Sequence, residues 1–398
     1  MQGQQPAAGG RAQYRDPDPF SLEAQGQDIT VLPDGDERRK ALLELVSRAE
    51  SSLKVAFYIF ADDGIGKALR DALCEACERG VNVTLIIDDF GASVDEAFLT
   101  PLKRAGGEVM RFAPRAGLRY LIRNHQKMAI ADDERAMFGG FNVEDDYFAP
   151  PQDNGWNDLG FTIEGEAVAG LVDWFSRLVE WTRDDTAHLK AIRRAVRSWD
   201  WAQTSAGEKV RWLVGGPTRG LSTWAACVKN DLIEGDRLDL AMGYFSPPKR
   251  ILKRIGRIAA EGETRLVMAG KSDNALTIGA SRSLYDYLLK KGAHVYEFDA
   301  CKMHTKLLVL DDTVYIGSAN FDMRSLYINL EIVLRIEDAD FADRMRAYCD
   351  HLVQGAVRIT PELHKRRATL WNRLRWNIGW LVVSVLDYTI SRKGNLGL

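Results

Sequence analysis

Two stretches of the chain decide the fold, HQKMAIAD at residues 125–132 and HTKLLVLD at residues 304–311. Both read HxKxxxxD, and each is followed by a glycine-rich segment that ends in asparagine, GGFN at 139–142 and GSAN at 317–320. The apolar residues between Lys and Asp have the composition of a buried strand. On a strand, His and Lys at i and i+2 point to the same face, so an imidazole and an ammonium group emerge side by side. One copy could arise by chance, but two copies in matching places predict a duplicated chain.

The segments before each motif repeat the same order of elements. In the first half, residues 53–60 and 81–88 are apolar runs typical of strands, and residues 64–80 between them carry one apolar face at helical spacing. The second half repeats strand, helix, strand, helix and strand over residues 237–298. Strand–helix–strand units at this spacing indicate a parallel or mixed sheet. The sequence therefore predicts an α/β protein with two homologous lobes.

Composition excludes several classes of protein. The chain has 398 residues, 46% of them hydrophobic and 27% charged, which is globular rather than disordered or coiled-coil composition. With 53 Lys and Arg against 56 Asp and Glu, the net charge of −3 disfavours a general nucleic-acid binder. Five scattered cysteines do not form a disulfide framework and indicate a reducing compartment. The polar start is not a signal peptide, and no apolar run reaches the ~18–20 residues of a membrane-spanning helix.

We expect five regions along the chain. They are a disordered N-terminus (1–27), a first lobe (28–182), a connecting basic helix or linker (183–211), a second lobe (212–362) and a basic, Trp-rich tail (363–398). The connecting helix is interpreted as solvated, with a membrane-surface segment as the alternative. From residue 364 onward, seven Lys or Arg face a single Asp, and three tryptophans accompany them. The hypothesis for this tail is an interfacial membrane anchor, and the alternative is a helix packed on the lobes.

The two motifs suit the chemistry of a phosphodiester. A phosphodiester is anionic and repels nucleophiles, so lysines that neutralise its oxygens and asparagine amides that donate to them would assist attack. One neutral imidazole can attack phosphorus while the other, protonated, donates to the leaving alkoxide. Because lysine supplies the positive charge, we expect neither a metal nor a cofactor. The sequence contains no HExxH motif and no Asp/Glu cluster of the Mg²⁺ type.

These residues resemble the phospholipase D superfamily, which is named for its HKD motifs, over nearly all of residues 30–360. Within it, the chain resembles bacterial cardiolipin synthases in GGFN (139–142), GYFSPP (243–248) and GSANFDMRSLYINLEI (317–332). The resemblance implies two lobes, each a mixed β-sheet flanked by helices, related by a pseudo-twofold axis with one active site at their interface. It also implies transfer of a phosphatidyl group between phospholipids through a phosphohistidine, so that two phosphatidylglycerols give cardiolipin and glycerol.

The resemblance also implies roles for individual residues. His125 resembles the nucleophile and His304 the acid for the leaving group, although the reverse order stays open because the two motifs are nearly symmetric. Asp132 and Asp311 belong to the catalytic motif but lie a full strand away, so a structural role is expected for both. The implied site contains, as motif residues, His125, Lys127, Asp132, His304, Lys306 and Asp311; for phosphate, Asn142, Asn320 and Ser318; and for orienting the histidines, Asp158 and Glu331.

The expected partners are lipids. They are phosphatidylglycerol, with phosphatidylethanolamine as a second candidate, and an anionic membrane surface; nucleic acid is disfavoured, and the oligomeric state is left open. The expected location is peripheral, on the cytoplasmic side of the bacterial inner membrane. Two alternative activities remain: a hydrolytic phospholipase D that releases phosphatidic acid and, more distantly, a phosphodiesterase or nuclease of the same superfamily.

Overall fold

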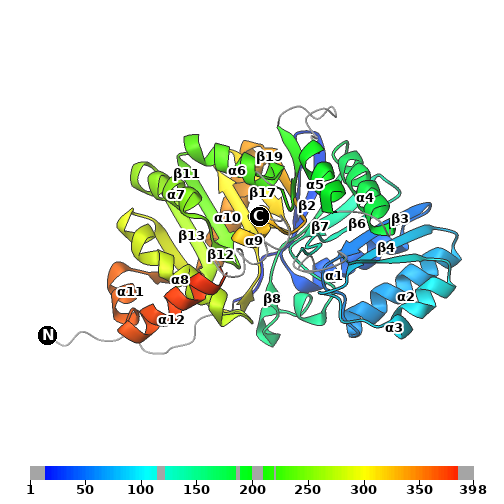
Figure 1. Cartoon of the computed structure of the whole chain (residues 1–398), viewed down its shortest axis with the longest axis horizontal. Helices are drawn as coiled ribbons and strands as arrows, with labels where there is room; N and C mark the ends of the chain where they lie inside the picture. The colour runs from blue at the N-terminus through cyan, green and yellow to red at the C-terminus, as the bar shows by residue number, and fades with distance from the viewer. Residues whose placement is uncertain (1–13, 114–121, 185–188, 200–208, 219–220, 384–398) are drawn as a thin grey trace.

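The chain forms two lobes that lie side by side (Figure 1). The computed structural model describes residues 14–113, 122–184, 189–199, 209–218 and 221–383. Each lobe is built on one eight-stranded sheet in which parallel and antiparallel pairs are mixed. This confirms the predicted class, an α/β protein with two homologous lobes of mixed sheet and flanking helices.

The sheet of the first lobe has the order β1-β2-β9-β7-β6-β3-β4-β5. Strands β3, β4 and β5 are parallel, as the strand–helix–strand pattern predicts, and the motif strand β6 runs antiparallel to β3. The bounds are β1 Phe20–Ala24, β2 Gln27–Leu32, β3 Ser52–Phe57, β4 Asn82–Asp88, β5 Glu108–Phe112, β6 Met128–Ala131, β7 Arg135–Gly139 and β9 Gly160–Glu164.

The sheet of the second lobe has the order β10-β19-β17-β16-β11-β13-β14-β20. Its motif strand β16 again runs antiparallel to the first strand of a parallel set, β11-β13-β14. The bounds are β10 Val210–Gly215, β11 Arg237–Met242, β13 Glu263–Ala269, β14 His294–Phe298, β16 Lys306–Leu310, β17 Thr313–Gly317, β19 Glu331–Glu337 and β20 Ala356–Ile359. Two short ribbons complete the strands, β12 Phe245–Ser246 with β18 Phe321–Asp322, and β8 Trp156–Asn157 with β15 Lys302–Met303.

Each motif strand turns back through a tight hairpin. In lobe one, Asp132 and Asp133 both have left-handed backbone angles (φ 55° and 63°), whereas in lobe two Asp311 alone does (φ 49°). The second connection is one residue shorter, and this tighter turn absorbs the difference. After the hairpins, Gly139 and Gly317 need the absence of a side chain, because a Cβ there would lie 2.4 Å and 2.2 Å from a carbonyl oxygen of the neighbouring strand.

Helices cover the outer face of each sheet and fill the space between the lobes. On lobe one lie α1 Gly35–Ser47, α2 Gly64–Glu78 and α3 Glu96–Arg104; on lobe two lie α6 Thr223–Glu234, α7 Lys249–Glu261, α8 Ala275–Lys290 and α9 Met323–Tyr327. Between the sheets lie α4 Val168–Arg183, α5 Leu189–Ser198 and α10 Ala339–Gln354. One continuous core joins both lobes there, with the Phe138 and Trp212 rings 4.9 Å apart. The lobes are therefore fixed relative to each other by buried apolar surface.

The start of the chain differs from expectation. Disorder was expected for residues 1–27, but β1 extends the first sheet, and the prediction is wrong for residues 14–27. The tight turn at Gln25 and Gly26 (φ 53° and 75°) closes the hairpin of β1 and β2, which forms one edge of the sheet. Before it, the Tyr14 ring packs edge-on against Phe298 of lobe two, at 4.9 Å. Residues 1–13 lie outside the described part.

The connecting helix and the tail are also more buried than expected. In α5, Ile192 and Val196 are buried in the core between the lobes, and Trp199 just after it donates to the carbonyl of Trp212, so this helix is not simply solvated. The tail forms α11 Pro361–Arg367 and α12 Leu370–Leu381, and α12 packs along α8. In the described part of the chain, no helix has the length and apolarity needed to cross a membrane.

Candidate active site

Both motif histidines sit where a segment of one lobe pairs with a segment of the other. His304 N donates to the carbonyl oxygen of Asn157 (2.8 Å), beside the parallel ribbon of β15 and β8. His125 N donates to the carbonyl oxygen of Leu330 (2.9 Å), and Leu330 N donates back to Arg123. The next residues along these partner segments are the two predicted orienting acids, Asp158 and Glu331. The main chain therefore delivers each acid to the histidine of the opposite lobe.

The side chains complete this exchange. Nδ1 of His304 lies 2.6 Å from Oδ2 of Asp158, and Nδ1 of His125 lies 3.0 Å from Oε2 of Glu331. Both carboxylates are fully buried, and the histidines are 3% and 8% exposed respectively. With Nδ1 held by a carboxylate, Nε2 is the ring nitrogen available to a substrate on each histidine, and on His304 it lies 3.0 Å from Nζ of Lys306. The sequence predicted the two acids, but not that each one crosses to the other lobe.

The motif lysines lie buried beside their histidines. Lys127 Nζ donates to the carbonyl oxygen of His125 at 2.5 Å, and Lys306 Nζ donates to that of His304 at 2.6 Å. Burial lowers the pKa of Lys306 to about 8, although Asp158 and Glu331 oppose this shift, and it lowers the pKa of Lys127 well below its usual range. An anionic diester between the two lysines would relieve their desolvation and mutual repulsion.

The three residues expected to bind phosphate, Asn142, Asn320 and Ser318, differ in their surroundings. Asn142 Oδ1 accepts from Ile59 N at 3.1 Å, while its Nδ2 has no hydrogen-bond partner among the described residues. Asn320 is buried at the matching place in lobe two. Ser318 Oγ donates to Glu331 Oε2 at 2.5 Å and accepts from Ile332 N. In this structure its hydroxyl therefore holds Glu331, and the expected phosphate contact of Ser318 stays a prediction.

The motif aspartates lie at the far end of their strands. Asp132 accepts from the backbone N–H groups of residues 50–52, and Asp311 accepts from those of residues 236 and 237. Burial alone would raise the pKa of Asp132, but these hydrogen bonds hold it at about 2. Both aspartates tie the motif hairpin to the strand beside it. The structure therefore gives them a structural role and separates them from the histidines.

The two histidine–carboxylate pairs, His304 with Asp158 and His125 with Glu331, differ in charge. Burial raises the pKa of Glu331 to about 8, although Lys127 opposes this, whereas Lys306 and His304 outweigh burial and hold the pKa of Asp158 below its usual value. Burial and Lys306 lower the pKa of His304 to about 4, and burial with Lys127 lowers that of His125 well below its usual value. Without an anion, both imidazoles are neutral, and Asp158 is the more strongly ionised partner.

Arg38 is a residue that the sequence analysis missed. It is fully buried in α1, where Nη1 donates to the carbonyl oxygens of Pro33 (2.5 Å) and Asp158 (2.6 Å), and Nη2 to that of Tyr147 (2.8 Å). The guanidinium thereby fixes the segment that carries Asp158 and adds positive charge beside it. Its neighbour Arg39 is exposed, and no local pattern distinguishes the two arginines in the sequence.

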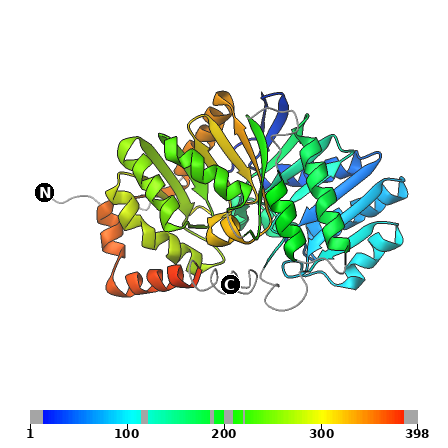
Figure 2. The same ribbon diagram turned by 45° about the horizontal axis from the view of Figure 1, so that its top comes forward.

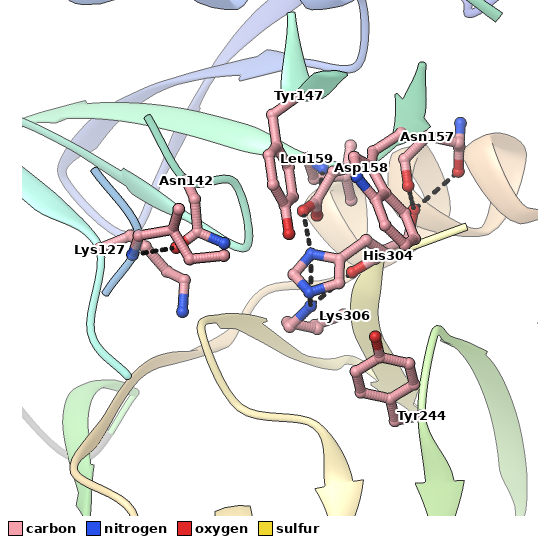
Figure 3. A network of polar contacts seen from close by, with 12 residues as sticks. Lys127, Asn142, Tyr147, Asn157, Asp158, Leu159, Tyr244, His304 and Lys306 are labelled. Atoms are coloured by element: carbon pink, nitrogen blue, oxygen red, sulfur yellow. Dashed lines mark hydrogen bonds and ion pairs between the residues drawn. The ribbon is translucent and has the colours of Figure 1, made fainter. Parts of the chain in front are cut away.

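Aromatic rings enclose the His304 half of the site (Figure 3). The centroids of Tyr147, Trp156 and Tyr244 lie 5.1, 5.4 and 5.9 Å from that of the His304 ring. Around His125 the described residues place one ring, that of Tyr58, at 5.0 Å.

Outside Tyr58, Arg123 donates to its hydroxyl and lies over the Phe90 ring at 4.1 Å. Arg115, Arg119 and Tyr120, which precede Arg123 in the sequence, lie outside the described residues. Within the described ranges, no group of three or more His, Cys, Asp or Glu side chains could hold a metal ion.

Each of the two α/β lobes contributes a histidine, a lysine beside it and a carboxylate that contacts the histidine of the other lobe. This arrangement defines a protein of the phospholipase D superfamily. The family description "Cardiolipin synthase, PLD-like domain" matches residues 42–179 and 231–353. The chain belongs to this family and is a cardiolipin synthase-like enzyme.

Relatives of known name agree with this assignment. "Cardiolipin synthase 2" of Bacillus anthracis is 30% identical over 367 residues, which cover 85% of this chain and 67% of the relative. "Major cardiolipin synthase ClsA" of Bacillus subtilis (strain 168) is 28% identical over 375 residues, 91% of this chain and 76% of the relative. Among solved structures, phosphatidylserine synthase of Haemophilus influenzae Rd KW20 is similar with a TM-score of 0.69 and 15% identity, covering 92% of this chain and 97% of that one. At this identity, the structural likeness concerns the fold alone.

Proposed function

We propose that the enzyme transfers a phosphatidyl group from one phospholipid to another through a phosphohistidine on His125. The observation that carries this proposal is the pair of histidine–carboxylate contacts between the lobes. They hold Nδ1 of two buried histidines, so that Nε2 of each can act beside the two lysines. The substrates are phosphatidylglycerol as donor and acceptor, with phosphatidylethanolamine as a second candidate.

In the first step, the Nε2 lone pair of His125 attacks phosphorus and the bond from phosphorus to the glycerol oxygen breaks. His304, protonated at Nε2, gives its proton to that oxygen, and glycerol leaves. The ionised Asp158 favours the imidazolium form of His304 once an anionic diester is bound. Lys127, Lys306 and the free amide of Asn142 stabilise the non-bridging oxygens.

In the second step, neutral His304 takes the proton from a headgroup hydroxyl of another phosphatidylglycerol. The oxygen attacks phosphorus, the N–P bond breaks, and cardiolipin forms while His125 is regenerated neutral. The rings of Tyr147, Trp156 and Tyr244 restrict water around the base, and this favours transfer over hydrolysis. We place the reaction at the cytoplasmic face of the bacterial inner membrane; the five free thiols support a reducing compartment.

Product analysis tests the proposal. The enzyme is incubated with phosphatidylglycerol, and the products are identified by mass. Cardiolipin with one glycerol per turnover is the expected result, whereas phosphatidic acid would indicate a hydrolytic phospholipase D. His294→Ala provides a matched control, because His294 is exposed on β14 outside the site. Absence of both products, with cleavage of single-stranded DNA instead, would overturn the proposal.

A further inference from the structure

The C-terminal helix α12 is fixed to the second lobe by one of its faces. Gly379 allows the close approach, because a Cβ there would lie 2.8 Å from the carbonyl oxygen of Leu276 on α8. The buried Trp376 ring stacks on His364 with centroids 5.4 Å apart. The predicted alternative of a packed helix therefore describes this face, and α12 is part of the folded lobe.

The opposite face of α12 is apolar and exposed. Leu370 is 90% exposed and Trp371 67%, and the other members follow at helical spacing. We call this surface the apolar stripe; it consists of Leu370, Trp371, Leu374, Ile378 and Leu381 of α12. Five of the eight large apolar side chains that are exposed in the described part of the chain belong to it. Scattered exposed apolar residues need no explanation, but a contiguous set indicates a contact surface.

Basic side chains flank the apolar stripe. The exposed residues Lys365, Arg366 and Arg375 come from α11 and α12, whereas Arg373 is paired with Asp286 of α8 at 3.0 Å. Residues 363–383 contain no Asp or Glu. An apolar face bordered by arginine, with a tryptophan among its members, is the pattern of a helix that lies in a membrane interface. A protein partner or a second copy would have to supply acidic groups to match these cations, whereas anionic headgroups supply them on any such bilayer.

The start of α8, which α12 covers, is close to the active site. Leu276 comes three residues after Asp273, which accepts from the Tyr244 hydroxyl at 2.9 Å, and the Tyr244 ring is one wall of the His304 half. Figure 2 shows α12 running along the edge of the second lobe toward the junction of the two lobes. A surface that held a lipid bilayer against this stripe would present headgroups to the site.

We propose that the apolar stripe is the surface by which the enzyme docks on an anionic lipid bilayer, with α12 lying in the plane of the interface. This inference rests on the proposed function, because it concerns how diacyl substrates reach that site. The leucines and Trp371 enter the boundary between headgroups and acyl chains, and the flanking arginines bind headgroup phosphates. The lobe carries the helix, so docking also orients the junction of the lobes toward the bilayer.

The test compares the full-length double variant Leu374→Glu/Ile378→Glu with Ile233→Glu, which changes an equally exposed side chain of α6. Binding is measured on vesicles of phosphatidylglycerol and phosphatidylcholine, and turnover on a short-chain phosphatidylglycerol below its micelle concentration. We expect the double variant to bind vesicles at least about tenfold more weakly, while Ile233→Glu binds like wild type and both retain short-chain turnover. Both variants should unfold at the wild-type temperature, since the changed side chains are exposed.

Three results would overturn the docking proposal. They are unchanged vesicle binding by the double variant, equal loss in Ile233→Glu, and loss of self-association instead of vesicle binding, which would assign the stripe to a second copy. Deleting residues 384–398 tests whether that segment makes the membrane contact instead. If the deletion abolished vesicle binding and the double variant did not, the contact would belong to residues 384–398 and not to the stripe. His125→Ala separates this test from the chemistry, since it should bind vesicles normally while transfer is lost.

Discussion

The two halves of the active site have the same plan and different chemistry. In one half His304 lies 2.6 Å from an ionised Asp158, inside a shell of three aromatic rings; in the other, His125 lies 3.0 Å from Glu331, whose pKa is raised to about 8. In the proposed mechanism the first arrangement suits the general acid, because Asp158 favours the imidazolium form of His304 once the anionic diester is bound. In the same proposal the second suits the nucleophile, because the neutral His125 is more exposed than His304, 8% against 3%. The two halves therefore share one plan and differ in the acid that holds each histidine.

A single glycine reflects the same difference. Gly140 occupies the place that Ser318 has in the other lobe, and a Cβ on Gly140 would lie 2.3 Å from Oδ1 of Asp158. The shorter aspartate is held by Leu159 N, at 2.8 Å, whereas the longer Glu331 is held by the Ser318 hydroxyl. Each lobe thus has its own way of fixing the acid that it donates to its partner.

The largest effects are expected when the two histidines are replaced one at a time. His125→Ala should abolish transfer, and His304→Ala should slow it by about 10²–10⁴-fold, the usual contribution of a positioned general acid. A phosphatidyl ester of p-nitrophenol needs no acid for its leaving group, so His304→Ala should still release p-nitrophenol rapidly in the first turnover. His125→Ala should release none.

The intermediate gives an independent check of this assignment. With labelled lipid and a rapid quench, an alkali-stable, acid-labile label should accumulate on His125 in His304→Asn and be absent from His125→Asn. A burst of p-nitrophenol from His125→Ala, or label that persists in His125→Asn, would reverse the roles of the two halves.

Arg38 sharpens the comparison, because it serves the His304 half alone. Arg38→Lys should keep the charge but lose the fork that binds the carbonyls of Pro33, Asp158 and Tyr147. We expect transfer from phosphatidylglycerol to fall about 10–100-fold, within the range for supporting residues of a site. Release of p-nitrophenol from the activated ester should fall much less, which a merely destabilised protein would not show.

Arg79→Lys is the matched control, because Arg79 also binds backbone carbonyls, those of Val46 and Ala49, away from the site. It should leave both substrates unaffected. Equal losses on the two substrates in Arg38→Lys would mean that Arg38 acts only on stability.

How much of the fold and of the active site could be predicted from the sequence depends on whether the interactions join residues near to each other or far apart in the chain. The histidines, lysines and both strands were predicted because period-two spacing and the repeat are local properties of the sequence. The two acids were found by resemblance, but their exchange depends on Asn157 and Leu330 pairing with segments far away in the chain. Arg38 has the same sequence signal as the exposed Arg39, and the two faces of α12 became distinct only when α8 covered one of them.

The pH profiles of kcat/KM and kcat allow the free and the lipid-bound site to be compared. Lys306 is charged below its pKa of about 8 and neutral above it, so kcat/KM for a soluble diester should fall about tenfold per pH unit above pH 8. Once the anionic diester is bound, it stabilises the ammonium group, and the fall in kcat should begin at higher pH. Initial rates between pH 6 and 10 provide both profiles. A kcat limb at the same pH as the kcat/KM limb would contradict direct contact between Lys306 and the phosphate.

The smallest expected effect concerns the way Glu331 is held. Ser318→Ala removes the hydrogen bond from Oγ to Oε2, and a typical hydrogen bond contributes about 0.5–1.5 kcal/mol. We expect transfer to slow by about three- to tenfold, with the loss in formation of the phosphohistidine, because Glu331 orients the nucleophile and not the acid. The activated ester should therefore suffer as much as phosphatidylglycerol, the opposite of the Arg38→Lys pattern. Rapid-quench measurement of the labelled intermediate supplies the rate of that step. If Ser318→Ala instead slowed only the natural substrate, Ser318 would serve the leaving-group side, and the division of the site into a nucleophile half and an acid half would have to be redrawn.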